Sequence, residues 1–197
     1  MKPATLPPAF EEALSAFRRA HGVVHYFVFE ASGLRGLELH RTASLAAFEA
    51  LRALLERSSF HLTIEPARMS ATETTVEAFL GEARPGTLTS PRAFLEERER
   101  ELSLHKAFSA DLEPGYLHAF VDPPYGLRLS PEKVQRIFDT LNEHLFGGFT
   151  DDLEIFRWST DWSNFFADGL EWWGAYWWTI HDRTRGIVSV LAASATD

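Results

Sequence analysis

The chain has 197 residues, of which 45% are hydrophobic and 24% charged, a composition typical of one globular domain or two very small ones. It contains no cysteine, which excludes disulfide frameworks, thiolate metal sites and cysteine nucleophiles. Its formal net charge is −9, and because an acidic surface repels phosphate backbones, we expect no nucleic-acid partner.

The first quarter of the chain predicts a helix, a strand and a second helix. A proline pair at 7–8 and apolar residues at helical spacing predict the first helix, which Gly22 ends. Residues 23–29 are β-branched or aromatic and predict a buried strand. A short extended piece over residues 37–40 then leads to a helix with Ser44 as its N-cap.

The middle of the chain has weaker signals. Residues 60–64 alternate apolar and polar side chains, which predicts a half-buried strand. Helices are predicted over residues 72–83 and 91–110, and the second has a charged centre typical of a solvated face. Residues 116–121 predict another strand. The break between the two helices leaves a division into two lobes near residues 85–110 open.

The C-terminal part has the clearest boundaries. A Ser-Pro pair at 130–131 starts a well-marked helix. A strand follows at 153–158, and residues 176–181 and 187–191 predict a β-hairpin. We therefore predict one compact α+β domain over residues 1–197, with a mixed or largely antiparallel sheet packed with about five helices and ending in this hairpin.

No motif with a strong catalytic meaning is present. The chain lacks both glycine-rich nucleotide loops, the Gly-x-Ser-x-Gly elbow and the His-Glu-x-x-His metal motif, and we expect no cofactor. Three of its eight histidines, His25, His118 and His181, fall on predicted strands and could converge on a metal ion if Asp161 or Glu171 supplied a further ligand. Their spacing is loose, so isolated histidines and no metal site are the favoured prediction.

The most informative segment is residues 146–178. It holds all six tryptophans and 12 of the 26 aromatic residues, and residues 146–197 carry −5 of the net charge. Successive strand residues point to opposite faces, so Trp177 and Trp178 should face opposite ways. Two interpretations stay open, a Trp-rich second core beside a solvated acidic loop, or a binding surface.

The leading hypothesis is a soluble, acidic binding protein that associates stoichiometrically with a basic protein, with a toxin-immunity inhibitor as its concrete form. Tryptophan anchors surrounded by carboxylates are typical of tight interfaces, and the carboxylates would raise the association rate. The expected contact residues are Asp161, Trp162, Asp168, Glu171, Trp172 and Trp177. Because no signal-like leader or apolar run long enough to span a bilayer is found, we expect a cytoplasmic location and no membrane partner.

Two alternatives remain. A small hydrolase-type enzyme could use Asp161 and Glu171 as general acid and base in a Trp-lined cleft, with His181 as another candidate base. A homo-oligomer could instead bury an exposed tryptophan face against its own copy.

Overall fold

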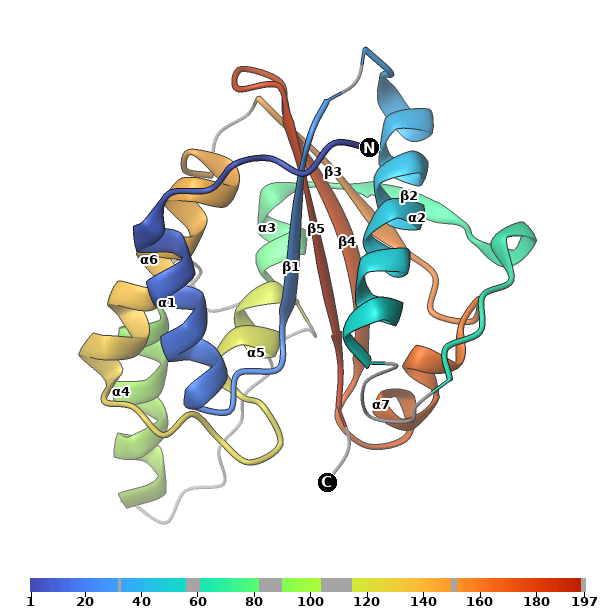
Figure 1. The fold of residues 1–197 in the computed structure, drawn as a ribbon. Coiled ribbons are helices and arrows are strands. Elements are labelled where there is room, and N and C mark those ends of the chain that lie inside the picture. Colours follow the sequence, from blue (N-terminus) through green and yellow to red (C-terminus); the bar gives the residue numbers. More distant parts are fainter. Residues whose placement is uncertain (32, 56–60, 82–89, 104–114, 150–151, 196–197) are drawn as a thin grey trace. The chain divides into compact units, whose positions relative to one another are not determined.

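The computed structural model describes residues 1–197 except 32, 56–60, 82–89, 104–114, 150–151 and 196–197 (Figure 1). Seven α-helices and a five-stranded antiparallel sheet lie in the described part of the chain, which confirms the predicted α+β class. The chain divides into two compact units. The first comprises residues 1–5, 24–76 and 145–197, and the second comprises residues 6–23 and 77–144. Of the range 85–110, where a division was considered, the described residues 90–103 belong to the second unit.

The sheet of the first unit has the strand order β1-β5-β4-β3-β2, with every neighbouring pair antiparallel. The strands are β1 (His25–Glu30), β2 (Ala71–Thr74), β3 (Leu153–Trp158), β4 (Ala175–Asp182) and β5 (Ile187–Ser194). The central strands β4 and β5 form the predicted C-terminal hairpin, with Trp177 opposite Ala192. Both are almost continuously buried.

Helix α2 (Gly36–Leu55) packs over one face of this sheet, against β1, β4 and β5 (Figure 1). Its buried stripe includes Leu39, Ala43 and Phe48, which recur at helical spacing. The extended piece predicted over residues 37–40 is therefore wrong. The apolar stripe already begins at Leu39, so the helix starts two turns before Ser44, which lies buried in its interior.

Two further predictions for the first unit need correction. Of residues 60–64, position 60 lies outside the described residues, and the structure has only a single bridge, between Ile64 and Ser163, instead of a strand. The helix predicted over 72–83 begins instead as strand β2, because its threonines favour the extended backbone next to β3. Val76–Leu80 is helical, as α3, and residues 82–83 lie outside the described residues.

The second unit is helical. It contains α1 (Pro8–Arg19), α4 (Pro91–Ser103), α5 (Tyr116–Val121) and most of α3 and α6 (Pro131–Phe146). Stacked rings form its core, with centroids 4.5 Å apart for Phe17 and Phe120 and 5.1 Å apart for Phe79 and Tyr116. Of the helix predicted over 91–110, the stretch 104–110 lies outside the described residues.

The strand predicted over residues 116–121 is wrong, since these residues form α5. Nearly all of its side chains are buried, so its sequence shows no helical periodicity, and a short apolar run cannot be assigned by pattern alone. Across the described ranges, none of the helices is long and apolar enough to cross a bilayer.

Candidate functional site

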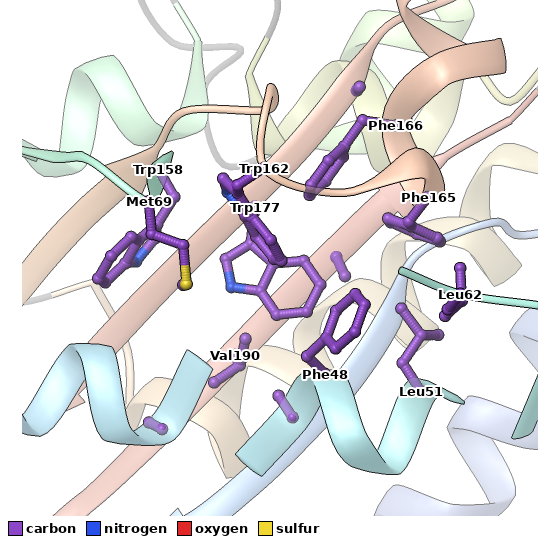
Figure 2. Close-up of a cluster of buried hydrophobic side chains, with 14 of the residues drawn as sticks. Phe48, Leu51, Leu62, Met69, Trp158, Trp162, Phe165, Phe166, Trp177 and Val190 are labelled. Atoms are coloured by element: carbon purple, nitrogen blue, oxygen red, sulfur yellow. The ribbon is translucent and has the colours of Figure 1, made fainter. Parts of the chain in front are cut away.

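Five aromatic residues of segment 146–178 belong to the core between α2 and the sheet, namely Trp158, Trp162, Phe165, Phe166 and Trp177. Figure 2 shows Trp162 beside Trp177, and their ring centroids are 5.1 Å apart in an edge-to-face arrangement. Both indoles are 0% exposed. Trp162 and Trp177 therefore cannot touch a partner in this structure, which corrects their place among the predicted contact residues.

The buried indoles of this core also have partners for their N–H groups. Trp177 Nε1 donates to Ser44 Oγ at 3.1 Å, and Trp158 Nε1 donates to Thr179 Oγ1 at 2.9 Å. Trp178 faces the opposite side of the sheet, as predicted, and stacks on Tyr176 with centroids 5.0 Å apart. These tryptophans are explained by packing and hydrogen bonding, without a ligand.

A different part of the same segment is exposed. Helix α7 (Ala167–Trp172) carries Asp168, Glu171 and Trp172 at positions i, i+3 and i+4, which places them on one helical face. All three side chains are exposed, and the exposed fraction of Trp172 is 71%. The structure thus brings together three of the six predicted contact residues, and we call them the α7 face.

Gly169 fixes α7 against the end of β5. A Cβ atom at this buried position would lie 2.4 Å from Ser194 Oγ and 2.5 Å from the carbonyl oxygen of Gly174, so only glycine permits the approach. The amide of Gly174 closes the helix by donating to the Gly169 carbonyl at 2.6 Å. The α7 face is therefore presented by a helix that packs closely on the sheet end.

Asp161 has a local partner of its own. It is exposed and pairs with Arg68 at 3.1 Å. Its hydrogen bond from Ser159, together with Arg68, holds the pKa of the Asp161 carboxyl below its usual value. A carboxyl stabilised in its ionised form is poorly suited to act as a general acid, and neither Trp162 nor Trp177 is exposed to line a cleft beside it.

A second candidate site lies on the sheet face that α2 covers, away from the Trp162–Trp177 pair. His40 of α2, Glu154 of β3 and His181 of β4 meet there, and Glu154 and His181 are directly opposite each other in the strand register. Glu154 Oε2 is 3.4 Å from His181 Nδ1 and 3.7 Å from His40 Nε2. We call these three residues the His-Glu-His cluster.

A cavity of about 610 Å³ opens beside the cluster. Its lining residues are Ala31, Gly33, Leu34, Arg35, Gly36, Glu154, His181 and Arg183. Arg183 places Nε 3.7 Å from Glu154 Oε2, and its side chain is 56% exposed. The cavity therefore reaches two members of the cluster and is bordered by two guanidinium groups.

His40 is fully buried and has only one of its ring nitrogens hydrogen-bonded. Nδ1 lies 2.7 Å from Thr179 Oγ1, whereas Nε2 has no hydrogen-bond partner among the described residues. Burial lowers the pKa of His40 from 6.5 to about 4, and the opposing attraction of Glu154 only partly offsets this effect. His40 is therefore a neutral imidazole at neutral pH.

The histidines that the sequence grouped together are not the ones that meet. His25 lies opposite Ala192 of β5, and Ala192 in turn lies opposite Trp177 of β4. His25 is therefore level with Trp177 in the sheet, and His181 is four residues further along β4. His118 lies on α5 in the second unit. His40 was missed because it was assigned to an extended piece. In a helix that starts at Gly36 it lies three residues before the buried Ala43 and would have been placed facing the sheet.

Comparisons with protein-family models and with curated proteins find no match for this chain.

Proposed function

We propose that the protein is a cytoplasmic, acidic binding protein that associates stoichiometrically with a basic protein partner, in the manner of a toxin-immunity inhibitor. The observation that carries this proposal is the α7 face, where Trp172, which is 71% exposed, shares one helical face with two exposed carboxylates. Tryptophan is highly buried on average, and it is one of the residue types enriched among interface anchors.

The charge of the chain favours a basic partner. Residues 146–197 carry −5 of the net −9, and the α7 face contributes Asp168 and Glu171 to that charge. Carboxylates around an apolar anchor accelerate encounter with a positively charged surface and disfavour acidic surfaces. The same charge disfavours self-association through this face, because a twofold dimer would bring the two pairs of carboxylates together.

The test is quantitative capture from extracts of the cells that naturally produce the protein, followed by kinetics with the purified partner. Two variants alter the α7 face, Trp172→Ala and the double variant Asp168→Asn/Glu171→Gln. Tyr125→Ala is the matched control, because Tyr125 is 64% exposed but belongs to the second unit.

We expect a basic protein that binds one-to-one to the wild type and to the Tyr125→Ala variant. Trp172→Ala should weaken its affinity by about 30-fold or more, mainly through faster dissociation. Asp168→Asn/Glu171→Gln should slow association and reduce its salt dependence. Equal binding by all variants, or a wild-type dimer that Trp172→Ala dissociates, would overturn the proposal.

A further inference from the structure

We propose that His40, Glu154 and His181 form a binding site for one divalent transition-metal ion of the zinc class. The site is independent of the α7 face and of the function proposed for it. All three groups belong to the first unit, and their ligand atoms lie within 4.8 Å of one another. Three secondary-structure elements that pack together, α2, β3 and β4, supply one ligand each.

The distances suit a single small ion. Ligand atoms at ~2.0–2.2 Å from a tetrahedral zinc ion lie ~3.3–3.6 Å from each other. Glu154 Oε2 is already 3.4 Å from His181 Nδ1 and 3.7 Å from His40 Nε2. The third pair of ligand atoms, on His40 and His181, lies within 4.8 Å. Binding of the ion would therefore draw the two imidazole rings closer together around Glu154.

The second observation is the buried nitrogen of His40. Its Nε2 has no hydrogen-bond partner among the described residues, and the side chain is fully buried, so this polar atom is left unsatisfied at a cost in stability. A metal ion bound between His40 Nε2 and Glu154 would satisfy the atom.

The surroundings of His40 also orient it for this role. Its Nδ1 lies 2.7 Å from Thr179 Oγ1, and Trp158 Nε1 donates to the same oxygen at 2.9 Å. With Nδ1–H donating to Thr179, the lone pair of His40 is on Nε2, which points to Glu154. Hydrogen bonds of this kind, from the second ring nitrogen of a histidine ligand, fix its tautomer and its ring orientation.

The donor set determines the class of ion. Two imidazole nitrogens and one carboxylate oxygen suit zinc and the neighbouring transition metals, whereas magnesium and calcium prefer sites made of oxygen atoms. Three protein ligands leave at least one coordination position open. Because Glu154 and His181 also line the cavity, together with Arg35 and Arg183, water or a small anion could reach that position.

Arg183 competes with the ion for Glu154. Its Nε is 3.7 Å from Glu154 Oε2, and its side chain is exposed enough to move into solvent when an ion binds. The alternative explanation of the cluster is an ion-pair network in which Arg183 itself neutralises Glu154. The two explanations predict opposite effects of removing Arg183, because a metal site would gain affinity from the loss of a nearby positive charge.

The experiment is calorimetric titration of chelator-treated protein with Zn²⁺, with Mg²⁺ as a second probe and the Co²⁺ absorption spectrum as an independent readout of ligation. His181→Gln and Glu154→Gln each remove one ligand. His61→Gln is the matched control, because His61 is an exposed histidine outside the cluster. Circular dichroism establishes that every variant is folded, and His40 itself is left unchanged because it is part of the core.

We expect one Zn²⁺ per chain, with no comparable response to Mg²⁺. His181→Gln and Glu154→Gln should lower the affinity about 100-fold or more and abolish the Co²⁺ spectrum, since each removes a direct ligand. Arg183→Gln should raise the affinity several-fold, and His61→Gln should leave it unchanged. The proposal is overturned if no one-to-one binding occurs, if folded His181→Gln binds as tightly as the wild type, or if Arg183→Gln weakens binding.

Discussion

The sheet face beneath α2 has two chemically different ends. At one end Trp162 and Trp177 pack edge to face with phenylalanines, and the indole N–H groups of Trp158, Trp162 and Trp177 each have an acceptor. At the other end, the same face carries His181 and Glu154, which border a cavity. The tryptophan end is a completed core, because the polar atoms of its indoles are satisfied. The histidine end differs because His40 Nε2 is buried without a hydrogen-bond partner among the described residues, and a buried polar atom of this kind near a cavity points to a ligand site.

The largest effect on stability is expected from removing a buried indole at the tryptophan end of this sheet face. Trp177→Ala should lower the free energy of unfolding by about 3–5 kcal/mol, because it removes a fully buried indole and leaves a cavity. Urea unfolding followed by circular dichroism measures the change. Trp172→Ala is the control and should change stability by only ~0.5 kcal/mol or less, since that ring is exposed. If the two variants were equally stable, Trp177 would not belong to the core.

The polar end should make stability depend on pH in chelator-treated protein. Groups from two strands face His40, namely Glu154 on β3 and both Thr179 and His181 on β4. Because burial lowers the pKa of His40 from 6.5 to about 4, the unfolded chain binds a proton more readily than the folded chain in that range. The contribution of His40 is therefore fully present above pH 6.5 and is lost as the pH falls towards 4.

The loss should be on the order of 3 kcal/mol, from a pKa that falls from 6.5 to about 4 at ~1.4 kcal/mol per unit. Chemical unfolding at a series of pH values measures it, with His40→Gln as the comparison. Burial also lowers the pKa of His118, so the relevant quantity is the difference between the two proteins. Parallel pH profiles would show that His40 is not held neutral by the fold.

Thr179 joins the two ends, since its hydroxyl oxygen accepts from Trp158 Nε1 and lies 2.7 Å from His40 Nδ1. Thr179→Val keeps the shape of the side chain but removes the shared oxygen. It should lower the free energy of unfolding by about 1–3 kcal/mol, because buried donors lose their acceptor. Thr179→Ser retains the hydroxyl and should be less destabilising. The reverse order would mean that the methyl group, and not the hydrogen bonds, is what matters at this position.

The smallest effect concerns the tryptophan that lies outside the core. Trp172→Phe should reduce the quenching of tryptophan fluorescence by acrylamide without a measurable change in stability, because Trp172 is 71% exposed. Trp173→Phe, which alters a half-buried ring next to it, should reduce quenching less. Equal losses of quenching would show that α7 does not present Trp172 to solvent as described.

The fold could be predicted where local signals and tertiary packing agree. The Ser-Pro start of α6, the strand 153–158 and the C-terminal hairpin all appear as expected. Prediction failed for α5 because its side chains are buried on all sides, and failed at the start of α2 because Ser44 resembles an N-cap. Ser44 instead serves a tertiary role as the acceptor for Trp177, which no local pattern encodes.

The sites were predictable only in part. Asp168, Glu171 and Trp172 were chosen from the sequence because carboxylates and tryptophans are interleaved there, whereas the helix that places them on one face was not predicted. The His-Glu-His cluster joins residues 40, 154 and 181, and only the strand register and the packing of α2 bring them together. The burial of Trp162 and Trp177 likewise depends on which face of β4 is covered by α2, which composition alone does not determine.

The first unit is made of chain segments that lie far apart in the sequence, which has a consequence for the synthesis of the chain. Along its whole length β1 pairs with β5, so the strand made near residue 25 must await residues 187–194 before it can complete these hydrogen bonds. Residues 77–144, which belong to the other unit, leave the ribosome in the interval. Such non-local pairing gives a high contact order and slow folding. During that interval the apolar stripe of α2 has no sheet to cover it, and transiently exposed apolar surface of this kind is prone to aggregation.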